Sequence, residues 1–115
     1  LDDLGLEICG AHSALPEGAD KQRVLDELLT LGCTRCIANS GPPEFASLEA
    51  VKTLAGRLNA AHAAGSPHGI TIGYHNHWWE FEKSFDGKTA YDWLFELSDP
   101  AVFAEVDVHW VKTAG

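Results

Sequence analysis

The sequence alternates short apolar runs with longer stretches whose apolar residues recur at helical spacing. The short runs predict strands at residues 5–13, 34–40, 69–77 and 101–110. The spaced stretches, each followed by a glycine or proline breaker, predict helices at residues 20–31, 45–64 and 88–97. The predicted order of elements is therefore β-α-β-α-β-α-β.

This alternation is typical of the α/β class, in which helical crossovers join the strands of a parallel sheet. Four strands cannot close a (β/α)8 barrel, which takes roughly 250 residues. We therefore predict that residues 1–115 are a single segment of a partial TIM barrel, incomplete at both ends. It would have about four parallel strands and three crossover helices. The sequence after the last predicted strand suggests no covering helix, so the remainder of the barrel or a second copy would complete the fold.

The chain is acidic, with 8 Lys and Arg against 17 Asp and Glu and a formal net charge of −9. This charge repels phosphate backbones and argues against a nucleic-acid partner. It suits a protein that holds a divalent cation and a small polyhydroxy substrate. No apolar run reaches the ~18 residues that a membrane span needs, and residues 1–10 lack the basic start of a secretory signal. These features predict a cytoplasmic protein with no membrane partner.

The three cysteines make an odd count, which argues against a disulfide scaffold and for a reducing compartment. Cys33 and Cys36 form a CxxC pair, and Cys9 and His12 have the same spacing. Such pairs can hold zinc. However, Cys36 falls inside a predicted strand and no loop surrounds either pair. We therefore predict buried, reduced thiols.

Polar side chains gather where each predicted strand ends, at residues 12–13, 39–40, 75–80 and 107–110. In parallel α/β sheets, functional residues lie at the carboxyl ends of the strands. The sequence therefore predicts a site at that edge of the sheet.

The run GYHNHWWEFE at residues 73–82 is the densest of these clusters. His75 and His77 are two apart on a predicted strand, so both rings should lie on one side, about 7 Å apart. Neutral imidazole binds divalent metals and moves protons near neutral pH. The simpler alternative is that each histidine hydrogen-bonds a neighbour. Glu80, three residues further on, favours a functional role, and an extended loop would turn Glu80 into the cleft.

The two tryptophans Trp78 and Trp79 are either core residues or a platform on which a sugar ring stacks. Asp107 stands between two valines on the last predicted strand, where an unpaired carboxylate would cost several kcal/mol. It must therefore be metal-bound, hydrogen-bonded or part of an ion pair. Glu105 and His109 would share its face at period two, with Glu105 as the partner of a lysine or arginine.

The runs GYHNHWWEFE and AEVDVHWVKTAG resemble the sugar phosphate isomerase/epimerase family, the xylose isomerase-like TIM barrels. Members carry a His-Asn-His…Glu-Phe stretch at the end of one central strand and an Asp-x-x-Trp or Asp-x-x-His stretch at the end of the next. The upstream GAHSAL, which contains His12, is similar to a strand end that lines the family's pocket. The resemblance covers nearly the whole chain.

The resemblance implies a divalent metal ion (Mn, Mg, Co or Zn) and a sugar, keto-sugar or inositol substrate. The ion would acidify a C–H bond next to a carbonyl, and a side chain would move the proton. The implied metal ligands are Asp107, Glu80 and His75, and the implied catalytic residues are Glu80 and His77. The implied substrate-binding residues are His12, His75, His77, Trp78 and Trp110.

The sequence departs from the family pattern in two ways. Many members place a glutamate ligand near the position of Tyr74 or His75. The family's remaining histidine and glutamate ligands come from later strands, so this segment alone should bind metal weakly and turn over nothing. The alternatives are a related lyase or dehydratase on the same barrel, and a non-catalytic carbohydrate-binding module. The net charge disfavours a third, phosphodiester hydrolysis.

Overall fold

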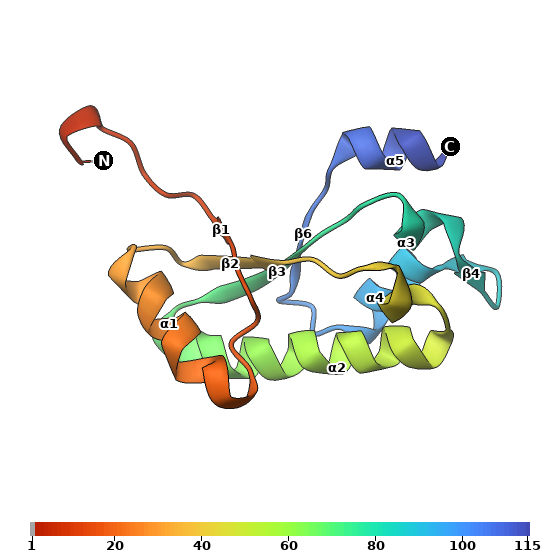
Figure 1. Ribbon diagram of the computed structural model, residues 1–115, viewed down its shortest axis with the longest axis horizontal. Helices are drawn as coiled ribbons and strands as arrows, with labels where there is room; N and C mark the ends of the chain where they lie inside the picture. The colour runs from red at the N-terminus through yellow and green to blue at the C-terminus, as the bar shows by residue number, and fades with distance from the viewer. Residues whose placement is uncertain (1) are drawn as a thin grey trace.

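A computed structural model describes residues 2–115 and contains a sheet of four parallel strands (Figure 1). The strand order is β1-β2-β3-β6, which keeps the order of the sequence. The strands are β1 Ala11–His12, β2 Arg35–Ala38, β3 Thr71–His75 and β6 Phe103–Glu105. The predicted α/β class and the four parallel strands are confirmed.

Three longer helices cross over between successive strands, as predicted. They are α1 Lys21–Thr30, α2 Leu48–Gly65 and α4 Ala90–Leu97, and all three lie on one side of the sheet (Figure 1). The remaining elements are the short helices α3 Trp79–Glu82 and α5 Val108–Ala114, the hairpin of β4 Ser84–Phe85 and β5 Lys88–Thr89, and 3-10 turns at Asp2–Leu4, Gly18–Asp20, Pro42–Phe45 and Ser66–His68.

The hydrophobic core lies between these helices and one face of the sheet. Because side chains alternate along a strand, Ile72 and Tyr74 of β3 point into this layer, where both are fully buried. The helices contribute apolar stripes, including Leu28 of α1, Leu58 of α2 and Leu94 of α4. Each buried side chain of this size contributes roughly 1.5–3 kcal/mol. Burial of these side chains therefore determines which residues of each strand point to the opposite face of the sheet, away from the helices.

The opposite face of the sheet carries the alternate residues, and at the carboxyl ends of the strands these are the polar ones. Gly73 on this face allows the ring of Phe103 to lie directly over β3, since a Cβ at Gly73 would come within 2.4 Å of that ring. Beyond Gly73 and Phe103, the next residues on this face are His75 and Glu105, which are paired in register. The sheet thus places an imidazole beside a carboxylate.

The predicted last strand, residues 101–110, is wrong in its second half. The strand ends at Glu105, and Asp107 caps helix α5, which begins at Val108. Asp107 and His109 therefore do not continue the face of Glu105 at period two, and a helix does follow the last strand. The aspartate ends the strand because its carboxylate satisfies the free N–H groups of the helix that follows.

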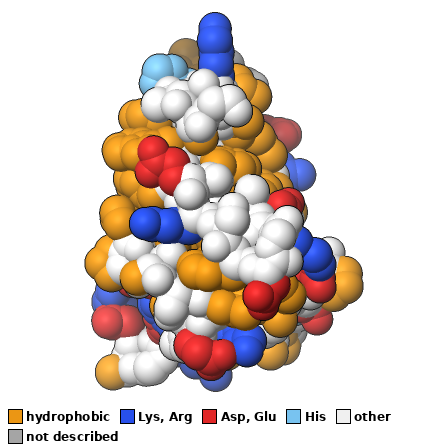
Figure 2. Space-filling view, turned by 90° about the vertical axis from the view of Figure 1, so that its right-hand side faces the viewer, with side chains coloured by type: hydrophobic (Ala, Val, Ile, Leu, Met, Phe, Trp, Pro, Cys, Tyr) orange, Lys and Arg blue, Asp and Glu red, His pale blue; other side chains and the backbone are white. Residues whose placement is uncertain are grey.

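None of the helices within residues 2–115 is both long and apolar enough to cross a membrane. On the face shown in Figure 2, basic and acidic side chains are scattered among apolar ones, without a basic patch. A cytoplasmic location stays a prediction.

Two of the three cysteines are buried as predicted, and the third is not. Cys33 and Cys36 lie in the core, whereas Cys9 is exposed. Burial, with a smaller effect of Cys33, raises the pKa of the Cys36 thiol to about 11. Because the thiolate is the reactive form, we expect Ellman's reagent at mildly alkaline pH to react quickly with Cys9 alone. Cys9→Ser should remove the fast phase, and three thiols reacting together would contradict the buried positions.

Candidate functional site

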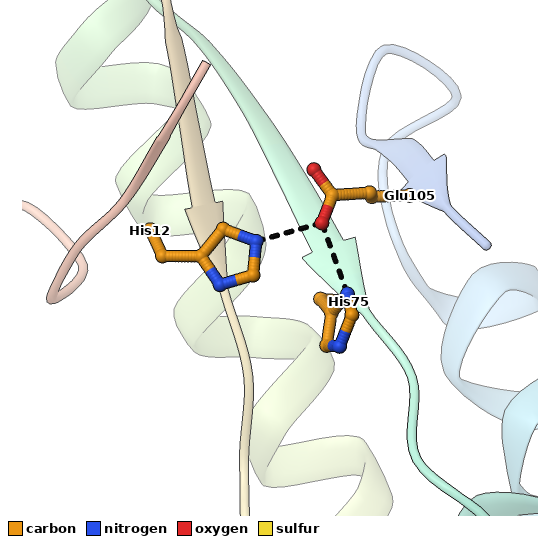
Figure 3. Close-up of side chains that lie close together, drawn as sticks. All are labelled: His12, His75 and Glu105. Atoms are coloured by element: carbon orange, nitrogen blue, oxygen red, sulfur yellow. Dashed lines mark hydrogen bonds and ion pairs between the residues drawn. The ribbon is translucent and has the colours of Figure 1, made fainter. Parts of the chain in front are cut away.

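Three side chains from three strands meet at the carboxyl edge of the sheet. His12 ends β1, His75 ends β3 and Glu105 ends β6. Each offers one nitrogen or oxygen atom, and these atoms lie within 4.8 Å of one another. Figure 3 shows His12 reaching across β2 toward the other two. The meeting of strand ends that the sequence predicts is therefore present in the fold.

Glu105 joins the two histidines through a single oxygen atom. Its Oε1 lies 2.6 Å from Nε2 of His12 and 2.9 Å from Nδ1 of His75. Partial burial would raise the pKa of Glu105, but the hydrogen bonds from His12 and His75 outweigh it, and the pKa lies below its usual value. Glu105 therefore pairs with two histidines, not with the lysine or arginine that the sequence suggested.

Asp107 follows β6 and uses its two carboxylate oxygens differently. Oδ1 accepts hydrogen bonds from the backbone N–H groups of His109 (2.9 Å) and Trp110 (3.4 Å). Oδ2 lies 3.7 Å from Nε2 of His75, which is too long for a hydrogen bond. Asp107 is thus held by the helix cap while one oxygen is left facing an imidazole nitrogen.

Asn76 fixes the position of Asp107, a role that the sequence analysis did not identify. Its fully buried side chain accepts from the backbone N–H of Asp107 (2.9 Å) and donates to the carbonyl of the same residue (3.2 Å). The side-chain amide of Asn76 therefore links the chain just after β3 to the chain just after β6, beyond His75 and Glu105, the last pair of the parallel ladder. The signal in the sequence was a polar residue enclosed by two histidines.

An aromatic cluster lies beside this edge of the sheet. The ring of His77 stacks on Trp79, with centroids 4.2 Å apart and planes 13° apart. His75 lies 5.3 Å from His77, and Trp110 lies 6.1 Å from it. Trp78 contacts Trp110 with centroids 4.8 Å apart. The tryptophans therefore pack on one another and on His77, and all are partly exposed.

Glu80 lies behind this cluster and not in an open cleft. It is fully buried, because residues 79–82 form the helix α3 and not an extended loop. Its Oε1 accepts from the hydroxyl of Tyr74 (2.9 Å) and its Oε2 accepts from the backbone N–H of His77 (2.9 Å). Burial, together with the nearby charge of Glu80, raises the pKa of Tyr74 above its usual value. Tyr74 therefore stays protonated as a donor.

His77 is the side chain that connects Glu80 with the edge of the sheet. Its Nδ1 is buried and makes no hydrogen bond to the described residues, and Oε1 of Glu80 lies 3.7 Å away. The structure thus brings four side chains together at the strand ends: His12, His75, Glu105 and Asp107. Glu80 lies apart from this group and hydrogen-bonds to Tyr74 and to the backbone of His77.

Two solved structures share the fold of this chain. The first is a sugar phosphate isomerase/epimerase from Parabacteroides distasonis, with a TM-score of 0.79 and 21% identity over 98% of this chain and 51% of that chain. The second, a sugar phosphate isomerase/epimerase from the same organism, has a TM-score of 0.72 and 25% identity over 98% of this chain and 46% of that chain. Comparison of the sequence with protein-family models and with curated proteins gives no match.

These comparisons define the chain as a partial TIM barrel that spans about half the length of the structures it matches. The two sequence motifs predict a resemblance to the sugar phosphate isomerase/epimerase family, and the second structure, at 25% identity, confirms this resemblance.

Proposed function

We propose that this chain supplies half of the active site of a metal-dependent isomerase or epimerase. The substrate would be a sugar, a keto-sugar or an inositol derivative, and the reaction would proceed by proton abstraction next to a carbonyl. A lyase or dehydratase on the same barrel would use the same first step. The observation that carries the proposal is that Nε2 of His75 and Oδ2 of Asp107 face each other, 3.7 Å apart, at the strand ends.

These two atoms fit a divalent cation. Oδ1 of Asp107 is occupied by the helix cap and Nδ1 of His75 by Glu105, so each residue presents its other atom to the same space. An imidazole nitrogen and a carboxylate oxygen suit Mn, Mg, Co or Zn. A bound ion would polarise the substrate carbonyl and acidify the adjacent C–H bond.

Two ligands are too few for a stable site, so the other ligands would come from outside these 115 residues. The structural relatives are about twice as long as this chain. We propose that residues 1–115 are one segment of such a barrel and that its remainder, or a second copy, completes the site. The proposed activity therefore belongs to the completed barrel.

We assign the proton transfer to His77, supported by Glu80. Nδ1 of His77 is buried and faces Glu80, which leaves Nε2 to take the proton from the substrate and return it. The carboxylate 3.7 Å away would stabilise the protonated ring. A role for Glu80 as a metal ligand would require its hydrogen bonds to Tyr74 and His77 to break, so we favour its role behind His77.

The aromatic cluster and His12 would bind the substrate. Trp78 and Trp110 offer partly exposed rings beside His77, and the C–H face of a sugar stacks on such rings. The side chain of His12 is 49% exposed, and its Nε2 is bonded to Glu105, so its other ring nitrogen, Nδ1, can accept a hydrogen bond from a substrate hydroxyl group. The net charge of −9 suits a neutral substrate and disfavours nucleic acid.

The same tryptophans support a second candidate, a non-catalytic carbohydrate-binding module. The two functions differ in whether sugar binding needs the metal. NMR saturation transfer from the chain to a keto-hexose should increase on addition of Mg²⁺ if the metal site is part of the function. Equal transfer with and without Mg²⁺ would favour the binding module.

Metal binding itself is tested by titrating the chain with Mn²⁺ and following paramagnetic broadening of its NMR signals. We expect the signals of His75 and Asp107 to broaden first, and we expect His75→Ala to remove this local effect. His109→Ala is the matched control, because His109 is exposed and its hydrogen bond to Asp107 comes from its backbone N–H, which alanine keeps. Unchanged broadening in His75→Ala would refute the proposed site.

A further inference from the structure

We propose that Glu105 is a positioning residue that holds His75 with its proton on Nδ1, so that the lone pair of Nε2 faces Asp107. This inference rests on the proposed function, because His75 and Asp107 are the ligands that Glu105 would serve. Glu105 itself would touch neither metal nor substrate.

The hydrogen bonds of Glu105 determine where the protons lie. Oε1 accepts from both His12 (2.6 Å) and His75 (2.9 Å). An ionised carboxylate has no hydrogen to donate, so the proton in each bond belongs to the ring nitrogen. His12 is therefore protonated on Nε2, and His75 is protonated on Nδ1.

The consequence appears on the other side of the His75 ring. In a neutral ring with its proton on Nδ1, Nε2 carries a lone pair, and this atom lies 3.7 Å from Oδ2 of Asp107. Two acceptors that face each other gain nothing unless a cation lies between them. With the proton on Nε2, as imidazole favours in water, His75 could instead donate to Asp107 and close the site. Carboxylates that orient a metal-binding histidine commonly act in this way.

His12 contributes by holding the carboxylate. It lies 93 positions from Glu105 in the sequence and bonds the same oxygen that His75 uses. The bond reaches across β2 (Figure 3), so it restrains the Glu105 side chain, which is 38% exposed. His12→Ala should loosen Glu105 but leave the bond to His75 in place.

The test uses histidine-¹⁵N NMR on the metal-free chain at a pH well above the ordinary imidazole pKa of about 6.5. We expect the Nδ1–H form of His75 in the wild type and in His12→Ala, and the Nε2–H form in Glu105→Ala. Glu105→Gln should retain the Nδ1–H form, because its amide oxygen can still accept. Mn²⁺ affinity should fall about 10–100-fold in Glu105→Ala and by less in Glu105→Gln.

An Nε2–H form of His75 in the wild type, or an unchanged tautomer in Glu105→Ala, would overturn the proposal. So would a loss of Mn²⁺ binding in His12→Ala as large as that in His75→Ala, because His12, His75 and Glu105 would then be direct ligands. A purely structural role would lower stability without moving the proton. The tautomer is measured without metal. A chain that shows the expected tautomers, but whose broadening by Mn²⁺ is unchanged in His75→Ala, would therefore refute only the proposed function.

Discussion

Replacing Glu80 by alanine should lower the free energy of unfolding by about 3 kcal/mol. The carboxylate is fully buried and accepts from the hydroxyl of Tyr74 and the backbone N–H of His77. Its removal leaves the buried hydroxyl of Tyr74 and the partly buried N–H of His77 without partners, and the loss of a buried donor's partner costs about 1–3 kcal/mol. Urea denaturation followed by circular dichroism measures the change. The same variant should also loosen His77, which Glu80 holds next to the edge of the sheet.

Two further variants make this result specific. Glu82 lies on the same short helix but is exposed, so Glu82→Ala should change stability by no more than about 0.5 kcal/mol. Tyr74→Phe removes only one of the two donors and should fall between the two alanine variants. If Glu80→Ala proved as stable as Glu82→Ala, the hydrogen bonds of Glu80 would contribute nothing to the fold.

The fold was predictable because each of its elements has a local signal. The stripe of Leu54, Leu58 and their neighbours specifies α2 at helical period, and Gly65 marks its end. A parallel sheet then follows from the alternation of strands and helices. The error at residues 106–110 arose because valines on both sides of Asp107 suggest a strand. The competing signal at this position is the capping preference of aspartate, which marks the start of α5.

The site was less predictable because its contacts join distant parts of the chain. The histidines at residues 75 and 77 stand out in the sequence, but nothing near Glu105 shows that His12 will bond to it from 93 positions away. The role of Glu80 depends on burial, which changes a carboxylate near the cleft into one that braces Tyr74 and His77. Residue type predicted which chemistry is present, whereas the pairing of strands decides which groups meet.

Asp107→Asn should separate metal binding from folding. Asparagine caps helices as well as aspartate does, so the bonds to the N–H groups of His109 and Trp110 should persist. The amide NH₂ would then stand where Oδ2 faces Nε2 of His75 and would donate to it. Losing the hydrogen-bond partner of a metal ligand typically lowers metal affinity roughly 10–100-fold. Because Asp107→Asn changes the ligand itself, we expect Mn²⁺ affinity to fall about 100-fold or more. The free energy of unfolding should change by only a few tenths of a kcal/mol.

Asp107→Ala is the matched comparison, because it removes the metal ligand and the helix cap together. It should lose Mn²⁺ affinity to the same extent and also lose about 1 kcal/mol of stability. The Mn²⁺ titration and urea denaturation of both variants give the two quantities independently. Because Asp107→Asn leaves the cap in place and replaces only the free oxygen, wild-type affinity in this variant would show that Oδ2 does not bind the ion. His75 would then have lost its partner in the proposed site.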